Sequence, residues 1–381
     1  MAPEIAFEET ASLPRRSLVM DQMTGSGTSI RIASEQGHRA IGFDLDPLAV
    51  LMSKVWTTPI NVKKFRKRAA AIAAEAERLN AADVELPWVD HDNETTDFIE
   101  YWFANPQRDD LRKISSLLAG KRGHIAEALR IALSRIIVTK QRGASLAWDV
   151  SHSRPHKKRD ENDFPVITEF LKSVELIAKR LGEQPPPGNV HVAIADARQL
   201  SDVEAGSVDA IITSPPYLNA LDYMRGHRLA LVWLGYSVST LRATRAESIG
   251  NERSPTVGAN VELADDLCAV LNTFENLPER QSNMVRRYAL DIYAMVSEMY
   301  RVLRANGTAV LVVGNSCLRS IFIQNSLIVT TAAERVGFEL IRERERNLPT
   351  SKRYLPPPTD TEQSTLNKRM KTESILTFIK A

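Results

Sequence analysis

The sequence predicts an α/β fold in which parallel strands alternate with helices. Mainly apolar runs at 17–21, 40–47, 190–197 and 208–212 have the length and residue types of buried strands. A glycine-containing turn and a helix follow the first run, and the others end in acidic or hydroxyl side chains. The carboxyl ends of parallel strands meet along one edge of an open sheet, so we expect ligand-binding residues there.

The first strand leads into Gly25-Ser26-Gly27 and then a helix. Two glycines in this place allow a tight strand-to-helix turn and close approach by a ligand, although a purely structural turn would use them too. About 20 residues farther on, the second strand ends at Asp44, an acidic position that suits a ribose diol. Asp196, after the third strand, could accept a hydrogen bond from an adenine amino group or cap a helix.

The fourth strand runs into Thr213-Ser214-Pro215-Pro216-Tyr217. Two consecutive prolines fix their own φ angles and favour an extended residue before each, which holds the Ser214 hydroxyl and the backbone carbonyls in one geometry. Such a loop could receive a flat polar ring, with Tyr217 stacked on it and with Ser214 Oγ and the Pro215 carbonyl accepting from an exocyclic amine. An ordinary proline turn explains an isolated motif of this kind equally well.

A long helical insertion is expected between the second and third strands, at 61–188. Residues 61–80 are alanine-rich, and apolar residues recur at helical intervals between 114 and 136. Its charge is divided, because residues 71–110 contain two Lys or Arg against eleven carboxylates, whereas residues 111–159 contain twelve against two. The positive charge is densest in the predicted loop 148–159.

Composition is that of a globular protein, with 43% hydrophobic and 25% charged residues and a net charge of +2. An apolar run of about 18 residues and a signal-peptide pattern are both missing, so we expect a cytoplasmic protein. Cys268 and Cys317 give neither a disulfide framework nor metal-ligand spacing. His152 and His156 lack a carboxylate or cysteine partner at suitable spacing, so no metal site is expected.

The glycine turn, Asp44, Asp196 and Thr-Ser-Pro-Pro-Tyr follow four strands in an order that resembles the S-adenosylmethionine-dependent amino methyltransferases of DNA. The resemblance covers residues 15–55 and 189–381. It implies a Rossmann-like class I methyltransferase sheet with helices on both faces and an antiparallel carboxyl-terminal hairpin, at 338–342 and 374–379. It divides the chain into a first core part at 1–60, an inserted basic DNA-binding lobe at 61–188, and the remaining core at 189–381.

The same resemblance implies S-adenosylmethionine as cofactor, double-stranded DNA as partner, and a cognate restriction endonuclease as a candidate partner. The residues expected to surround the cofactor are Asp21, Met23, Gly25, Gly27, Thr28, Asp44, Asp46, Asp196 and Ala197. Those expected to hold the target base are Ser214, Pro215, Pro216 and Tyr217. Those expected to contact nucleic acid are Arg154, His156, Lys157, Lys158, Arg159, Arg225 and Arg228.

The Ser-Pro-Pro-Tyr form is typical of cytosine-N4 enzymes in this family, while Asp or Asn in the first position is commoner in adenine-N6 enzymes. Carbon-5 methylation needs a thiolate, and neither cysteine follows a proline or stands within the Ser-Pro-Pro-Tyr loop. Three alternatives stay open: adenine N6, an RNA or protein amide, and a DNA-binding module with a decayed cofactor site. The possibility of a decayed cofactor site is suggested by Gln22 and Met23, which stand where members of this methyltransferase family usually have Pro-Phe.

The carboxyl-terminal part is predicted to contain a helix at 284–303, a strand at 307–316, a helix at 326–336 and the two hairpin strands. Between those strands, residues 342–358 are expected to form a basic, proline-rich connection. Its ordinary role is a surface loop, and its charge also permits contact with nucleic acid.

Overall fold

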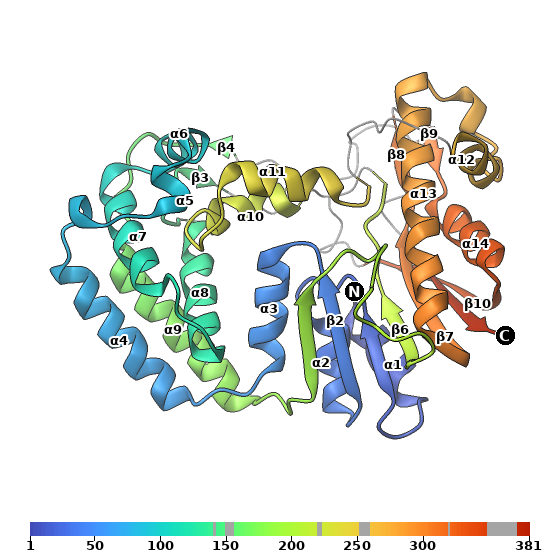
Figure 1. The fold of residues 1–381 in the computed structure, drawn as a ribbon, viewed down its shortest axis with the longest axis horizontal. Coiled ribbons are helices and arrows are strands. Elements are labelled where there is room, and N and C mark those ends of the chain that lie inside the picture. Colours follow the sequence, from blue (N-terminus) through green and yellow to red (C-terminus); the bar gives the residue numbers. More distant parts are fainter. Residues whose placement is uncertain (140–141, 149–155, 219–222, 251–259, 319–320, 349–371) are drawn as a thin grey trace. The chain divides into compact units, whose positions relative to one another are not determined.

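A computed structural model describes residues 1–139, 142–148, 156–218, 223–250, 260–318, 321–348 and 372–381 (Figure 1). The chain divides into two compact units. The first contains Met1–Leu45, Asn189–Leu221 and Ala246–Ala381, and the second contains Asp46–Gly188 and Asp222–Arg245. The second unit therefore includes most of the segment between the second and third core strands together with a later segment.

A seven-stranded sheet forms the centre of the first unit, in the order β10-β11-β7-β6-β1-β2-β5. β11 is antiparallel to both β7 and β10, while all other neighbours are parallel. This confirms the predicted α/β fold with its antiparallel carboxyl-terminal hairpin. The strands are β1 (Leu18–Asp21), β2 (Arg39–Asp44), β5 (Val190–Ile194), β6 (Val208–Thr213), β7 (Leu303–Gly314), β10 (Phe338–Asn347) and β11 (Thr372–Lys380).

Successive side chains of these strands face opposite sides of the sheet. Ile211 packs in the hydrophobic core with α13 (Glu279–Val302) and α14 (Asn325–Val336), while Ile212 faces the side where Glu9 of α1 (Pro3–Ala11) lies. Helices thus flank the sheet. The remaining elements of this unit are α2 (Thr28–Glu35), α12 (Val261–Cys268), η2 (Phe274–Asn276), and a small hairpin of β8 (Ser316–Leu318) and β9 (Ile321–Ile323).

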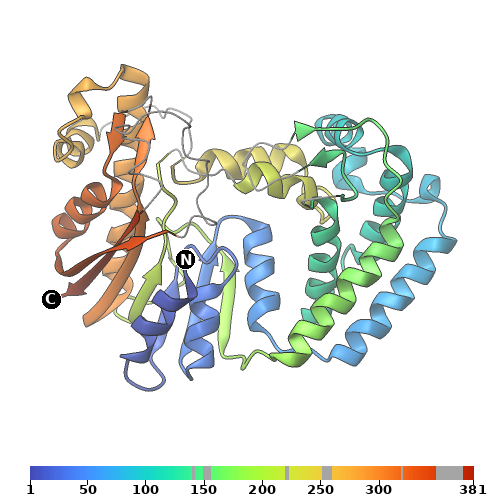
Figure 2. The ribbon, with the colours of Figure 1, turned by 180° about the vertical axis from the view of Figure 1, so that it is seen from behind.

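The second unit is mainly helical and has a hydrophobic core of its own. Asn61 caps its alanine-rich helix α4 by accepting a hydrogen bond from the Lys64 amide, and α4 runs beside α9 (Figure 2). The helices are α3 (Pro47–Thr57), α4 (Val62–Arg78), η1 (Ala81–Asp83), α5 (Pro87–Asp90), α6 (Asn93–Trp102), α7 (Asn105–Leu118), α8 (His124–Ile137), α9 (Val166–Glu183), α10 (Tyr223–Leu231) and α11 (Val238–Glu247). A two-stranded ladder joins β3 (Ala147–Trp148) to β4 (His156–Lys157).

Two predictions about loops were wrong. The basic loop expected at 148–159 begins and ends in the β3–β4 ladder, because residues 147–148 pair with 156–157. The connection expected from residue 342 begins later, because β10 continues to Asn347 and pairs with β11 along its length. The proline-rich part at 354–358 lies outside the described residues.

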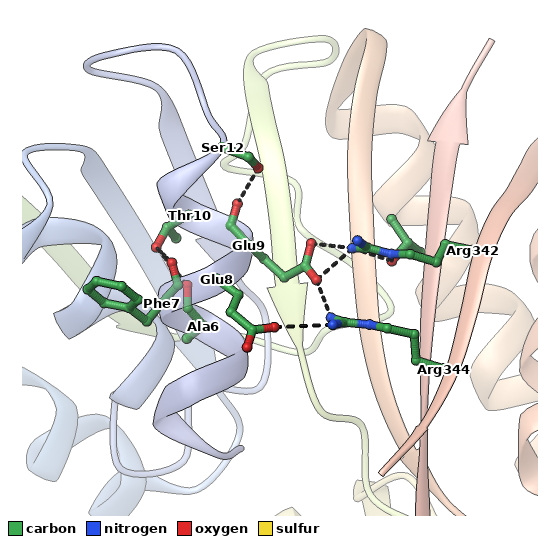
Figure 3. A network of polar contacts seen from close by, with 9 residues as sticks. Ala6, Phe7, Glu8, Glu9, Thr10, Ser12, Arg342 and Arg344 are labelled. Carbon is green, nitrogen blue, oxygen red and sulfur yellow. Dashed lines mark hydrogen bonds and ion pairs between the residues drawn. The ribbon is translucent and has the colours of Figure 1, made fainter.

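The arginines of β10 pair with glutamates of α1 (Figure 3). Arg342 Nη2 donates to both carboxylate oxygens of Glu9, at 2.6 and 2.7 Å, and Arg344 Nη2 donates to Glu9 Oε1 at 2.6 Å. Arg344 also binds Glu8, with 3.1 Å between Nη1 and Oε2. These arginines, which the sequence left open as nucleic-acid contacts, therefore connect α1 to β10, the edge strand of the sheet.

We expect Glu9→Ala to lower the free energy of unfolding by about 1 kcal/mol, and the loss to shrink in high salt. The Glu9 side chain is only 10% exposed and binds two guanidinium groups, whereas Glu8 is 59% exposed, so Glu8→Ala serves as a matched control with a smaller loss. Urea unfolding at low and high ionic strength measures both. Equal losses in the two variants would contradict the role given to Glu9.

Candidate active site

Four adjacent parallel strands place the predicted residues along one edge of the sheet. In the order β5, β2, β1, β6, their carboxyl ends lead to Asp196, Asp44, the glycine turn, and the loop Ser214–Tyr217. The sequence order alone could not establish that these ends are neighbours. The sheet brings all four features together in the first unit.

The glycine turn has the backbone geometry that its sequence predicts. Gly25 and Gly27 have φ angles of +51° and +84°, a region that disfavours other residues, and Gly27 directly precedes Thr28 at the start of α2. The Gly25 amide donates to Asp44 Oδ2 at 2.9 Å, which fastens the turn to the end of β2. Apart from Gly25 and its two chain neighbours, no described atom lies within 4 Å of where a Gly25 side chain would begin, so there is open space beside the turn.

Asp21 links the glycine turn to the strand that carries the Ser-Pro-Pro-Tyr loop. Its side chain is buried, and its Oδ1 accepts from Thr213 Oγ1 at 2.8 Å and from the Met23 amide at 3.1 Å. Burial raises the pKa of this carboxyl above its usual value, and the hydrogen bonds from Thr213 and Met23 offset part of that rise. Asp21 is thus an internal tie between two turns.

Asp196, which follows β5, forms an ion pair with Arg198. Arg198 Nε donates to Asp196 Oδ1 at 3.0 Å, and Arg198 Nη2 donates to Asp196 Oδ2 at 2.6 Å. Arg198 also reaches Asp291 Oδ1 on α13, at 2.6 Å, and the Glu247 carbonyl, at 2.8 Å. Desolvation opposes ionisation of Asp196, but hydrogen bonds and the charge of Arg198 outweigh it and lower the pKa. Asp196 is therefore a carboxylate acceptor at neutral pH. Ala197, the next residue, is buried in the core.

The Ser-Pro-Pro-Tyr loop is fastened to β7 at two points. Ser214 Oγ donates to the Val312 carbonyl at 3.0 Å. The Tyr217 ring lies against Gly314, where an added side chain would come within 2.5 Å of the ring, and its hydroxyl donates to Glu373 Oε1 at 2.9 Å. Pro215 is buried between these points and Pro216 is exposed. The hydrogen of the Ser214 hydroxyl is committed to β7, so its lone pairs are what it can offer to a ligand.

Asp46 belongs to the second unit, unlike the other residues predicted for the cofactor. It caps α3, with its Oδ1 accepting from the Leu48 amide at 2.8 Å. Its Oδ2 lies 2.5 Å from His227 Nδ1 on α10. Both carboxylate oxygens therefore have partners within that unit.

Two predicted basic segments meet on one helix of the second unit. Lys157 on β4 lies over the Tyr101 ring, with 5.2 Å from Nζ to the ring centroid, and Arg228 on α10 lies over the Phe98 ring at 5.0 Å. Phe98 and Tyr101 are both on α6, and Tyr101 is exposed. These aromatic residues were not predicted from the sequence, because α6 is acidic and carries no basic signal.

The other predicted basic residues are distributed around the same elements. His156 is exposed at the start of β4, and Lys158 and Arg159 follow that strand; Arg225 lies on α10 with Arg228. Arg154 and His152 lie outside the described residues. The amide of Lys158 donates to the Leu146 carbonyl at 3.1 Å, which extends the contact between the two short strands.

The described residues include neither a cluster of metal-ligating side chains nor an exposed cysteine. No group of three or more His, Cys, Asp or Glu residues within it could hold a metal ion. Both cysteines are buried, and burial raises the pKa of the Cys268 thiol to about 12. The helices that the structure describes include none with the length and apolarity to span a membrane.

Taken together, the strand order, the reversed strand β11 and the turn residues at one edge define a Rossmann-like class I methyltransferase fold with a helical insertion. No protein-family model matches the chain. Among solved structures, it is similar to a TehB-like SAM-dependent methyltransferase from Corynebacterium glutamicum, with 12% identity, a TM-score of 0.32, and 100% of this chain and 89% of that chain covered. It is also similar to a geranyl diphosphate methyltransferase, with 8% identity, a TM-score of 0.38, and coverage of 100% and 84%.

Its curated relatives are type II methyltransferases. M.AvaI from Nostoc is 24% identical over 388 residues, covering 88% of this chain and 75% of the relative. M.MvaI from Kocuria varians is 21% identical, covering 92% and 83%. M.BsoBI from Geobacillus stearothermophilus is 24% identical, covering 62% and 51%. The resemblance to DNA methyltransferases that the motifs predict is confirmed.

We expect the stability of the wild-type protein relative to Asp21→Asn to fall as pH rises. Burial raises the folded-state pKa of Asp21, so the folded state binds this proton more tightly than the unfolded chain does. The stabilisation is full below the unfolded pKa and is lost as pH rises through the folded pKa. Urea unfolding in a series from about pH 4 to 8 measures the difference.

Thr213→Val is the matched control for this prediction. It removes one hydrogen bond to Asp21 Oδ1 and keeps the side-chain shape, so its pH dependence should be at least as steep as that of the wild type. If Asp21→Asn and the wild type change in parallel over the whole range, ionisation of Asp21 is not the cause.

Proposed function

We propose that this protein is a site-specific DNA methyltransferase, which transfers a methyl group from S-adenosylmethionine to the exocyclic N4 amine of a flipped cytosine. The observation that carries the proposal is the geometry of Ser214. Its hydroxyl donates to the Val312 carbonyl, so its lone pairs are available to an amine donor. The relatives M.AvaI, M.BsoBI and M.MvaI, named as type II methyltransferases, support DNA methylation.

The residues at the sheet edge fit the proposed cofactor. Gly25 and Gly27 shape a turn with open space beside Gly25, which suits the methionine portion next to Asp21, Met23 and Thr28. Asp44 would bind the ribose and Asp196, ionised beside Arg198, would accept from the adenine amine; Asp46 and Ala197 follow these two acids in the chain. S-adenosylmethionine, when bound, supplies an electrophilic sulfonium methyl group.

The main task of the protein's own residues is to orient the amine that receives the methyl group. The amine of cytosine is conjugated with its ring, and acceptors at Ser214 Oγ and the Pro215 carbonyl would favour a pyramidal nitrogen with its lone pair available. Catalysis is then orientation and electrostatics. A base must leave the duplex at a cost of a few kcal/mol, and stacking on the Tyr217 ring would offset roughly 1–3 kcal/mol of it.

Adenine N6 is the second candidate acceptor, because the same two acceptors would hold its amine. A hydroxyl at position 214, where adenine-N6 enzymes commonly have a carboxylate or amide, favours cytosine. An RNA or a protein amide is less favoured because of the basic insertion.

The proposed DNA-binding surface lies on the second unit. Lys157 and Arg228 converge on the aromatic residues of α6, an arrangement of cations and rings that suits phosphates and bases. His156, Lys158, Arg159 and Arg225 lie on the same elements or next to them, and Arg154 would extend the surface. A cytoplasmic location and a cognate restriction endonuclease are part of the proposal.

The wild-type protein should transfer labelled methyl from S-adenosylmethionine to duplex DNA and yield N4-methylcytosine on digestion and mass analysis. Ser214→Ala should lower the rate roughly 10- to 100-fold, because it removes one acceptor for the amine. Cofactor affinity, measured by calorimetry, should stay unchanged. Ser207→Ala, a change at the other end of β6, is the matched control and should keep the wild-type rate.

Each other outcome of the methyl-transfer and cofactor-binding measurements leads to a different conclusion. N6-methyladenine would overturn the proposed base and keep the reaction. Cofactor binding without transfer to DNA would move the acceptor to RNA or protein. Absence of saturable cofactor binding would indicate a non-catalytic DNA-binding module.

Lys157→Gln and Lys158→Gln should each weaken DNA binding about equally on all sequences and reduce the salt slope by about 1, because each removes one phosphate contact. Lys179→Gln, an exposed cation on α9, is the control. Fluorescence anisotropy at several salt concentrations measures the slopes. Identical slopes in all three variants would place the DNA elsewhere.

A further inference from the structure

Tyr217 is held by residues that the Ser-Pro-Pro-Tyr motif does not contain. Its hydroxyl donates to Glu373 Oε1 at 2.9 Å, across 156 residues of sequence. The Glu373 side chain is 13% exposed, so little water competes for this hydrogen bond. We propose that Glu373 positions the Tyr217 ring for stacking on the target base.

The Tyr217 ring packs against Gly314, next to Glu373 in the sheet. Gly314 on β7 is the register partner of Glu373 on β11. A side chain at position 314 would come within 2.5 Å of Tyr217 Cε2 and 2.7 Å of Cδ2, so only glycine leaves room for the ring there. Gly314 thus packs against the ring, and Glu373, its partner on the next strand, accepts a hydrogen bond from the ring's hydroxyl.

The carboxylate is itself supported from the next strand. Arg346 on β10 is the register partner of Glu373 on its other side, and its Nη1 lies 3.8 Å from Glu373 Oε2. One oxygen of Glu373 therefore binds the tyrosine and the other faces a cation. Arg346 Nη2 also lies 3.9 Å from Glu4 Oε2 on α1. Glu4, Arg346, Glu373 and Tyr217 therefore form a continuous series of polar contacts from the amino-terminal helix to the Ser-Pro-Pro-Tyr loop.

The two contacts restrain different rotations of the ring. The hydroxyl oxygen lies on the axis of rotation about χ2, so its hydrogen bond to Glu373 mainly restrains χ1, whereas contact with Gly314 restrains rotation about χ2. Orientation is the main demand of amine methylation, so loss of this hydrogen bond should affect turnover more than DNA affinity. The role rests on the proposed function, because the stacked base is the proposed acceptor. Glu373 is a positioning residue, since it acts through Tyr217.

Four variants test the role: Glu373→Ala, Glu373→Gln, Tyr217→Phe, and the double variant Glu373→Ala with Tyr217→Phe. We expect Glu373→Ala to lower kcat roughly 10-fold with a smaller change in KM for DNA, and Glu373→Gln to recover most of the lost rate, because its amide oxygen still accepts from the hydroxyl. In the Tyr217→Phe background, Glu373→Ala should add less than about a twofold loss. Additive losses would overturn the proposal.

A second measurement does not depend on methyl transfer. In protein labelled with 3-fluorotyrosine, the fluorine resonance missing from Tyr217→Phe identifies Tyr217. That resonance should shift or broaden in Glu373→Ala and stay near its wild-type position in Glu373→Gln; an unchanged resonance in Glu373→Ala would overturn the proposal. If the wild type methylates no DNA, the proposed function fails, while the spectra still decide whether Glu373 holds the ring. If Glu373→Ala does not fold, Gly314→Ala displaces the ring with Glu373 in place and should move the same resonance.

Discussion

The hydrogen bond between Asp21 and Thr213 is the interaction on which the candidate site depends. β1 and β6 pair directly only at Val19–Ala210 and Met20–Ile211, so their carboxyl ends are joined beyond that ladder by side chains. Thr213 immediately precedes Ser214, and Asp21 precedes the glycine turn. A displacement of this one bond would move the proposed methyl-donor and methyl-acceptor positions relative to each other. Burial of the carboxylate is the energetic cost of that connection.

The same local hydrogen bond, from a backbone amide to the side chain of an aspartate two residues earlier, recurs at or just after the strand ends. Asp21, Asp46 and Asp196 each accept a hydrogen bond from the amide two residues later, at Met23, Leu48 and Arg198. The backbone therefore orients each carboxylate before any ligand arrives. Asp44 differs, because it accepts from Gly25 on the neighbouring strand's turn. Asp46 and Asp196 thus stabilise their own turns, Asp44 joins two turns, and Asp21 does both.

Much of the fold was predictable because its signals are local. Apolar runs, the glycine turn and the alanine-rich helix after Asn61 identify strands and helices within about a dozen residues. The Ser-Pro-Pro-Tyr loop was identifiable for the same reason. Its supports were not, since Glu373 and Gly314 reach Tyr217 through strand pairing between distant segments. Arg198 could have been suspected from its place two residues after Asp196, but its contacts with Asp291 and Glu247 could not.

Charge was the least informative signal in the sequence. Arg342, Arg344 and Arg346 suggested a basic loop, although their alternate spacing is that of one face of a strand, and their partners lie more than 330 residues earlier in α1. Conversely, α6 is acidic and yet presents the rings on which Lys157 and Arg228 lie. A run of like charges therefore identifies neither the partner nor the surface without the fold.

The bulk of the second unit occupies the connection between β2 and β5, two neighbouring parallel strands whose register begins at Ala40 and Val190. A helix would suffice for such a crossover, and here a separate hydrophobic core has grown within it. Closure entropy rises only slowly with loop length, so the sheet tolerates this enlargement at little energetic cost. The segment can thus lengthen or shorten at little cost, while the strands of the candidate site keep their register.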